Sequence, residues 1–205
     1  MNHRHNIGEY LTSLGLINKG VEVGVFKGDF SKEILSKWPG TLYMVDPWRQ
    51  LGDEYIDSSN HKNHSTAYSE TMGSIGGFED RAIMVRALSE QAVDLFEDDS
   101  LDFVYLDGNH AYDFIKQDIE LWYPKVKKGG LVAGHDYLGM DWYGGTTFLA
   151  NGKDKHIYSN NGSGPMKYAG IFGVNPAVDE FCKDNNYEVN LNNEAWFDTW
   201  WFIKQ

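Results

Sequence analysis

One stretch near the N-terminus, Gly20–Ser31, constrains the fold more than any other part of the sequence. It combines a short apolar run, glycines at positions 24 and 28, and a helical pattern that begins at Phe30. Glycine tolerates sharp backbone bends and lets the chain approach a ligand closely. A strand, a glycine turn and a helix in this order form the unit with which α/β proteins bind the adenosine part of a cofactor. We therefore expect an α/β fold with a cofactor site at this turn.

Apolar runs and helical patterns alternate along most of the chain. They predict parallel strands at Val21–Val25, Thr41–Val45, Ala82–Val85, Leu101–Leu106 and Gly130–Ala133, and an antiparallel pair at Tyr187–Leu191 and Trp196–Ile203. This alternation predicts a Rossmann-like, doubly wound sheet of seven strands, mostly parallel with a C-terminal antiparallel pair. The length of 205 residues suits a single domain, 1–205, with loop insertions at about 49–65 and 138–169.

Composition excludes several classes of partner. The formal net charge of −12 argues against nucleic acid or an anionic membrane, because both bind basic surfaces. The one cysteine, Cys182, leaves no internal disulfide and fits a reducing compartment. Met1–Tyr10 lacks the apolar core of a signal peptide, and no apolar run approaches the ~20 residues of a membrane span. We therefore expect a cytoplasmic protein.

Acids or histidines follow four of the five predicted parallel strands, where open α/β sheets bind their ligands. They are Glu22, Asp46, Asp107 with His110, and His135 with Asp136. Any one of them could simply cap a turn or the next helix. Four strand ends that deliver such groups to one rim predict an active site.

The glycine turn is not built for a dinucleotide. A pyrophosphate is bound by the spacing G-x-G-x-x-G, whereas here Gly24 and Gly28 are separated by three residues. Asp29 near the start of the helix would repel a phosphate. Asp46, at the end of the second strand, stands where a carboxylate accepts hydrogen bonds from a ribose. These features predict an adenosine without phosphates.

At these residues the sequence resembles the class I S-adenosylmethionine-dependent methyltransferases. Their first motif matches Glu22–Gly28. Further segments resemble the small-molecule O-methyltransferases called methyltransferase family 24, related to macrocin and mycinamicin sugar O-methyltransferases: Tyr105–Tyr112, Asp118-Ile119, Trp122, Lys128–Gly130 and Gly134–Tyr137. The resemblance runs from Val21 to Tyr137 and resumes at Val174; 138–173 has no counterpart.

The resemblance implies a role for each matching residue. Gly24 and Gly28 would pass under the methionine part of S-adenosyl-L-methionine, and Glu22 would anchor its amino group. Asp46 would bind the ribose, and Asp107 would face the methyl-transfer zone. The remaining cofactor-binding residues are Ser31 in the helix after the turn and Ala87, Leu88 and Ser89, which would lie along the adenine.

His110 lies three residues after Asp107, where the related sugar methyltransferases carry a catalytic base. An acceptor hydroxyl loses its proton as it attacks the methyl group, and histidine is suited to take it at neutral pH. His110 and Asp107 are therefore the candidate catalytic residues. The alternative is that His110 only caps the following helix.

The related metal-dependent enzymes bind Mg²⁺ through an acid after the fourth strand and an acidic pair after the fifth. The corresponding ligands here would be Asp107, His135 and Asp136, with His135 in place of the first acid of the pair. Imidazole suits Mn²⁺, Fe²⁺ or Zn²⁺ better than Mg²⁺. The resemblance therefore leaves open whether Mg²⁺ or Mn²⁺ is bound and whether His135 instead orients the substrate or shares the role of the base.

The sequence thus predicts a methyltransferase acting on a hydroxyl of a small molecule, such as a sugar or glycosylated metabolite. A metal-dependent hydrolase using Asp107, His110, His135 and Asp136, and a non-catalytic cofactor-binding module, remain alternatives. The loops at 49–65 and 138–169 would select the acceptor. The histidines and aromatic residues in or beside these loops either close over the acceptor or face solvent: Trp48, His61, His64, Trp142, Tyr143 and Tyr158. The aromatic residues of the second loop are also compatible with a homodimer.

Overall fold

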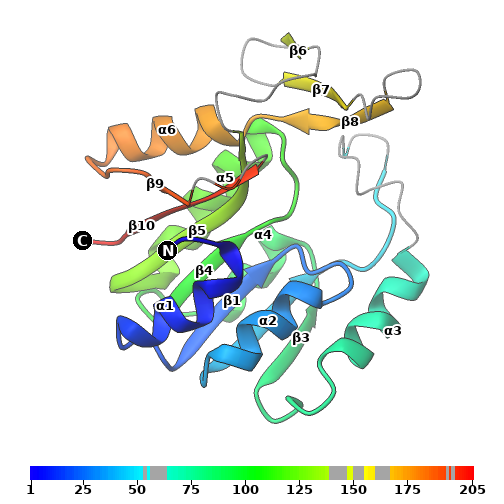
Figure 1. The fold of residues 1–205 in the computed structure, drawn as a ribbon, viewed down its shortest axis with the longest axis vertical. Helices are drawn as coiled ribbons and strands as arrows, with labels where there is room; N and C mark the ends of the chain where they lie inside the picture. Colours follow the sequence, from blue (N-terminus) through cyan, green and yellow to red (C-terminus); the bar gives the residue numbers. More distant parts are fainter. Residues whose placement is uncertain are drawn as a thin grey trace.

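The computed structural model describes residues 1–52, 55, 64–138, 147–149, 155–159, 167–192, 194 and 197–205. In this part of the chain a seven-stranded sheet has the order β3-β2-β1-β4-β5-β10-β9 (Figure 1). Its strands are β1 Lys19–Val23, β2 Thr41–Asp46, β3 Ala82–Arg86, β4 Leu101–Leu106, β5 Val126–Leu138, β9 Asn190–Leu191 and β10 Phe197–Ile203.

The pairing confirms the predicted sheet. The four contacts among the first five strands are parallel, and β10 is antiparallel to both β5 and β9. β4 is buried along its whole length, which explains why it reads as an unbroken apolar run. The sheet is therefore a Rossmann-like, doubly wound sheet with a C-terminal antiparallel pair.

Helices cover both faces of this sheet (Figure 1). They are α1 Ile7–Ser13, α2 Asp29–Lys37, α3 His64–Ser74, α4 Ser89–Ala92, α5 Tyr112–Trp122 and α6 Val174–Asp184, with the 3₁₀ turns η1 Arg4–Asn6, η3 Val93–Leu95 and η4 Tyr123–Lys125. One core packs α4, α5 and α6 against the sheet, and the other packs α1, α2 and α3. On α5 the helical spacing of Ile115, Ile119 and Trp122 buries all three side chains, and each contributes roughly 1.5–3 kcal/mol.

β5 is much longer than the predicted Gly130–Ala133. It begins earlier because Val126 pairs with Leu101 before a shift in register, and it ends later because Leu138 pairs with Phe197 of β10. β9, in contrast, has two residues where five were expected. The partner strands thus set these lengths, not the apolar run alone.

The insertion at 138–169 was predicted to be irregular, but its described residues include strands. β6 Thr147–Leu149, β7 Lys155–Ser159 and β8 Lys167–Phe172 form a separate antiparallel sheet. Its abundant Gly and Asn gave no strand pattern. His61, Trp142 and Tyr143 lie outside the described residues, as does the side chain of Tyr158, so the expected lid stays a prediction. No helix among the described residues is both long and apolar enough to cross a membrane.

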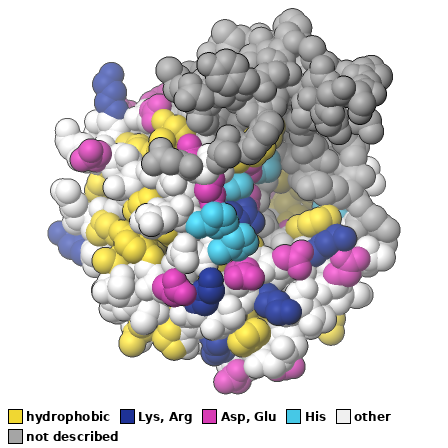
Figure 2. All heavy atoms as spheres, in the orientation of Figure 1, with side chains coloured by type: hydrophobic (Ala, Val, Ile, Leu, Met, Phe, Trp, Pro, Cys, Tyr) yellow, Lys and Arg dark blue, Asp and Glu magenta, His cyan; other side chains and the backbone are white. Residues whose placement is uncertain are grey.

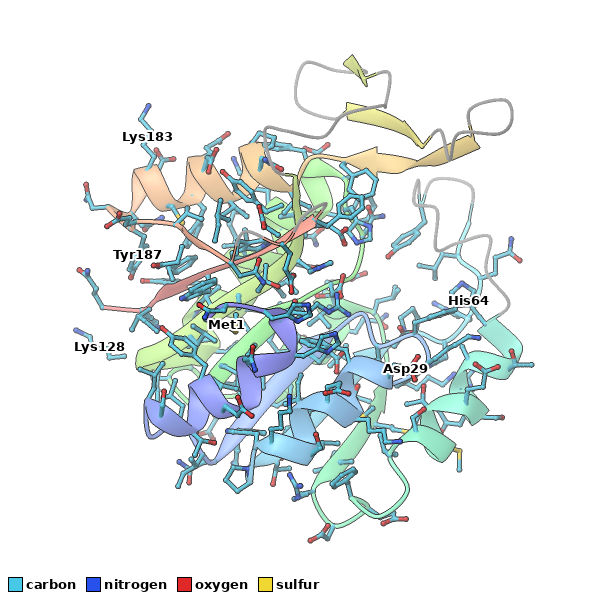
Figure 3. The ribbon with its side chains drawn as sticks, in the orientation of Figure 1. Met1, Asp29, His64, Lys128, Lys183 and Tyr187 are labelled. Atoms are coloured by element: carbon cyan, nitrogen blue, oxygen red, sulfur yellow. The ribbon has the colours of Figure 1, made fainter. Side chains whose placement is uncertain are left out.

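The sheet reverses its strand order between β1 and β4. In open α/β sheets a crevice forms at this switch point, outside the carboxyl ends of the strands. Figure 3 shows His64 near this end of the molecule and Lys128 at the other end of β5. The residues at the carboxyl ends of β1, β2, β4 and β5 are therefore placed to line one site.

Candidate active site

A cavity of about 960 Å³ opens at the carboxyl ends of the parallel strands. In Figure 2, acidic, basic and histidine side chains gather around a hollow near the middle of the face shown. The sequence-predicted residues that line the cavity are Glu22, Gly24, Asp46, Ala87, Leu88, Ser89, Asp107, His110, His135 and Asp136. Gly28 and Ser31 do not line it, although both support residues that do.

Gly24 brings the ends of β1 and β4 together. Its φ is +89°, and a Cβ built there would lie 2.0 Å from the carbonyl oxygen of Asp107. The backbone N–H of Asp107 donates to the carbonyl of Val23 at 2.8 Å, which fixes the approach. Glycine is therefore needed here to place Asp107, in addition to any contact with a ligand.

Gly28 and Ser31 act behind the cavity wall. Gly28 has a φ of +76° at the N-terminus of α2, and a Cβ there would lie 2.9 Å from Thr71 of α3. Ser31 donates a hydrogen bond of 2.5 Å to the carboxyl group of Glu22. Burial of Glu22, which is 1% exposed, raises its pKa to about 8. A cationic ligand would stabilise the ionised form of this carboxyl group.

Asp46 holds the glycine turn against β2. Its carboxyl oxygens accept hydrogen bonds from the backbone amides of Val25 at 3.0 Å, Phe26 at 2.9 Å and Trp48 at 2.6 Å. Burial nevertheless raises the pKa of Asp46. A carboxylate has about four acceptor positions, so one remains for a ribose hydroxyl.

Ser89 is the first residue of α4 and follows the N-cap residue Leu88. The Ser89 hydroxyl donates to Asp118 of α5 at 2.5 Å and accepts from the indole N–H of Trp122 at 2.8 Å. Asp118 is 7% exposed yet lines the cavity. Burial raises its pKa to about 7. The sequence resemblance included Asp118 but gave this carboxyl group no role.

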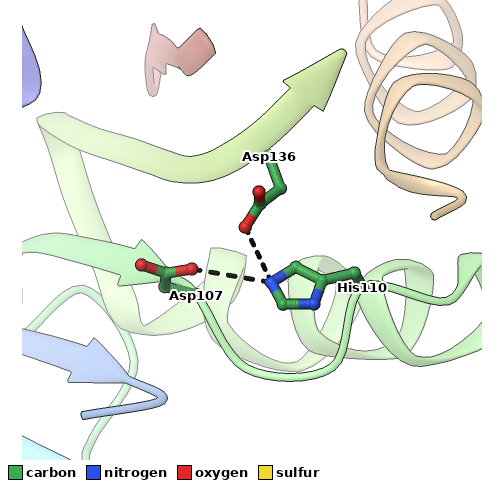
Figure 4. Close-up of side chains that lie close together, drawn as sticks. All are labelled: Asp107, His110 and Asp136. Carbon is green, nitrogen blue, oxygen red and sulfur yellow. Dashed lines mark ion pairs between the residues drawn. The ribbon is translucent and has the colours of Figure 1, made fainter. Parts of the chain in front are cut away.

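His110 lies between two carboxyl groups (Figure 4). Its Nε2 is 2.7 Å from Oδ2 of Asp136 and 3.7 Å from Oδ1 of Asp107. It does not cap α5: the N-cap residue is Ala111, whose backbone N–H donates to Oδ1 of Asn109 at 2.9 Å. The structure thus favours a site role for His110 over the capping alternative.

Asp136 is aimed at His110 by an unusual backbone conformation. Its φ of +59° lies in the left-handed region, which residues other than glycine adopt rarely and which often marks functional sites. Burial alone would raise the pKa of Asp136, but the imidazoles of His110 and His135 outweigh it and lower the pKa. Asp136 is therefore held as a carboxylate.

A metal site in this region would differ from the expected one in a single ligand. Ligand atoms of Asp107, His110 and Asp136 all lie within 4.8 Å of one another. His135 instead lies 3.3 Å from Asp136 through Nδ1 and 3.9 Å from Glu194 through Nε2. Two carboxylates and one imidazole fit Mn²⁺, Fe²⁺ or Zn²⁺ better than Mg²⁺.

The N-terminal segment contributes Arg4 to the wall of the cavity. The Arg4 guanidinium lies 3.6 Å from Oδ2 of Asp107 and 4.4 Å from the ring centre of Phe30. The backbone N–H of Arg4 and the imidazole of His3 both contact Glu194, at 2.8 and 3.1 Å. No local sequence pattern indicates these contacts, because the partners are far apart in the sequence.

The family model described as a methyltransferase domain matches residues 21–137, which is more than half of the chain. An uncharacterised protein of Sinorhizobium fredii is 30% identical over 94 residues, which cover 46% of this chain and 10% of that protein. An uncharacterised protein of Acanthamoeba polyphaga mimivirus is 26% identical over 125 residues, 60% of this chain and 52% of that protein. The chain thus spans about half or less of these curated relatives.

Solved structures share the fold over nearly the whole chain. An O-methyltransferase family protein from Burkholderia thailandensis matches with a TM-score of 0.62 at 12% identity, covering 98% of this chain and 55% of that one. The 1,6-didemethyltoxoflavin-N1-methyltransferase of the same organism, with bound 1,6-didemethyltoxoflavin and S-adenosylhomocysteine, has a TM-score of 0.58 at 9% identity and covers 100% and 79%. A precorrin-6y C5,15-methyltransferase from Geobacter metallireducens has a TM-score of 0.57 at 13% identity and covers 98% and 87%. At these identities the likeness concerns the fold.

Proposed function

This chain belongs to the methyltransferase domain family and has the class I fold of S-adenosylmethionine-dependent methyltransferases, and from that premise we propose that it methylates a hydroxyl group of a small molecule. The observation that carries the proposal is the 2.7 Å contact between His110 and Asp136 inside the cavity. A histidine oriented by a carboxylate is a suitable base for an alcohol that attacks a methyl group.

Acidic residues suit this cavity to S-adenosylmethionine, which carries a sulfonium and an ammonium group. In the proposed complex Glu22 faces the ammonium group, Asp46 the ribose, and Ala87–Ser89 the adenine. Asp29, at the first turn of α2, disfavours phosphate. The nearby acids therefore complement the charge of this cofactor better than that of a dinucleotide.

In the proposed reaction the acceptor oxygen attacks the methyl carbon in line with the carbon–sulfur bond. The bonding electrons pass to sulfur, which becomes a neutral thioether, and the hydroxyl proton passes to the His110–Asp136 pair. Placing the two reactants side by side supplies much of the rate enhancement. Asp107 lies within the same group and restrains the imidazole from the side of β4.

The residues that would hold a metal are Asp107, His110 and Asp136. Such an ion would lower the pKa of an acceptor hydroxyl. The ion would also occupy Nε2 of His110. This nitrogen can therefore either bind a metal or contact Asp136. We propose that His110 acts as the general base together with Asp136 and does not bind a metal. The proposed partner is a small hydroxylated acceptor and not a nucleic acid.

Two measurements test this function together. In thermal melting, S-adenosylhomocysteine at about 100 times its Kd is expected to add ~2.7 kcal/mol of stability, whereas NAD adds none. Transfer of a labelled methyl group from S-adenosylmethionine to a panel of sugars and other alcohols then reports activity. Stabilisation by NAD alone would overturn the proposal. Binding without product from any acceptor would favour the non-catalytic module, and chelator-sensitive hydrolysis without cofactor would favour the hydrolase.

A further inference from the structure

One end of the cavity is lined by the start of α4 and one face of α5; we call it the α4 end. Its lining residues are Tyr55, Ala87, Leu88, Ser89, Glu90, Phe114, Gln117 and Asp118. The rings of Tyr55 and Phe114 lie edge to face with their centres 5.4 Å apart. Aromatic and small apolar side chains of this kind suit a flat heterocyclic ligand.

Asp118 is the buried polar side chain of the α4 end, whereas Glu90 and Gln117 are exposed and Ser89 is already engaged. A hydroxyl group has one hydrogen, and the hydrogen of Ser89 points to Oδ1 of Asp118. The oxygen of Ser89 also accepts the indole N–H of Trp122. Ser89 therefore cannot donate to a ligand without releasing Asp118.

Asp118 itself keeps acceptor capacity. Ser89 uses one of the roughly four acceptor positions of its carboxyl group. Burial and the nearby Glu90 both disfavour its charged form and would also disfavour an anionic ligand. A group that donates hydrogen bonds to Asp118 would reduce this cost, and the exocyclic amino group of adenine is such a donor.

We propose that Asp118 is the residue that distinguishes adenine from other bases, by accepting a hydrogen bond from its 6-amino group. This assignment rests on the proposed function, which supplies the adenosyl cofactor. It places base recognition on α5, at a residue held by the chain Trp122–Ser89–Asp118. The hydroxyl of Ser89 then positions the carboxyl group without touching the base.

The experiment compares two ligands by calorimetry: S-adenosylhomocysteine and its 6-deamino analogue, in which hydrogen replaces the amino group. Deleting one partner of a buried hydrogen bond costs about 1–3 kcal/mol, so the wild-type protein is expected to bind the analogue about 5- to 150-fold more weakly. In Asp118→Leu, which keeps the shape but removes both oxygens, the two ligands are expected to bind with equal affinity. Asp118→Asn keeps an acceptor oxygen and is expected to retain part of the preference.

Asp113→Leu, at an exposed position of the same helix, is the matched control and should keep the wild-type ratio. If Asp118→Leu does not fold, Ser89→Ala still tests the idea, because the loss of the positioning hydroxyl should reduce the ratio several-fold. A wild-type ratio below about twofold, or an unchanged ratio in Asp118→Leu, would overturn this inference while leaving the proposed function intact. If the wild-type protein binds neither ligand, the proposed function itself fails.

Discussion

Asp118 and Asp136 are carboxyl groups in the wall of one cavity, the first buried and the second with 14% of its side chain exposed, and their pKa values shift in opposite directions. At the α4 end, the neighbours of Asp118 are a hydroxyl group and another acid, and burial raises its pKa to about 7. At the end of β5, two imidazoles outweigh burial and lower the pKa of Asp136. The same side chain is thus suited to hydrogen-bond recognition in one place and to orienting a base in the other.

The largest effect is expected from breaking the His110–Asp136 pair. His110→Ala removes the group that takes the acceptor proton, so turnover should fall by about 10²–10⁴-fold. Cofactor affinity should change by less than about twofold, because the adenosine contacts lie on other strands. Methyl-transfer kinetics and calorimetry measure the two quantities. Equal turnover in His110→Ala and in the exposed control His5→Ala would remove His110 from the mechanism.

A smaller effect is expected when the imidazole stays but its orienting carboxylate is neutralised. Asp136→Asn keeps the size of the side chain and removes the charge that holds His110, so kcat should fall by about 10–10²-fold. The pH at which activity rises should also shift, because the carboxylate no longer stabilises the protonated imidazole. A lower affinity for the acceptor with unchanged kcat would instead assign Asp136 to acceptor binding.

At the α4 end the expected effect is on stability. The pKa of Asp118 is about 7 when folded and near the ordinary 3.8 when unfolded, so the folded state binds more protons between these values. Stability of the cofactor-free protein therefore falls as the pH rises through this window. Asn cannot ionise, so Asp118→Asn should melt several degrees above the wild-type protein at pH ~8 and show little difference near pH ~4.

Asp113→Asn on the exposed face of α5 is the control for these melts. Glu22, with a pKa of about 8, leaves a slope of the same sign in every variant. Parallel melting curves for Asp118→Asn and the wild-type protein across the whole window would show that Asp118 is ionised at neutral pH. The contrast between the two ends of the cavity would then disappear.

The smallest effect is expected from removing metal ions. If the His110–Asp136 pair takes the proton, dialysis against a chelator should leave turnover within about twofold, since no step then requires an ion. A greater loss that Mn²⁺ restores would show that Asp107, His110 and Asp136 form a metal centre. The ionised carboxylate of Asp136 would then be a metal ligand and not the group that orients a base.

Much of this framework follows from local sequence patterns. The alternation of strands and helices predicts the sheet, because it depends on short-range periodicity. The acids at the strand ends predict the rim of the cavity, because parallel strands bring their carboxyl ends to one edge. Asp118 belongs to a segment that carries the family resemblance, but it was given no site role, since an acid within a helix usually faces solvent. Its spacing from Ile115, Ile119 and Trp122 places it on the buried stripe of α5, and this signal could have identified it.

Other features depend on tertiary contacts that no local pattern encodes. The φ of +59° at Asp136 arises in β5 opposite an irregularity in β10, and it turns the carboxyl group toward His110. The choice of His110 over His135 in the group with Asp107 follows from this geometry. The position of Arg4 beside Asp107 likewise requires Glu194, near the other end of the chain, to hold the N-terminal segment.

Gly24 constrains the evolution of the first motif through its contact with the second. The 2.0 Å between a Cβ built at this residue and the backbone carbonyl of Asp107 leaves space for hydrogen alone. A lineage cannot enlarge residue 24 without displacing that backbone, but the side chain at position 107 can change without a clash, because every residue carries the same carbonyl group. Glycine is therefore expected to persist at position 24 even in lineages that have replaced the acid at position 107, while the loops around the site vary independently.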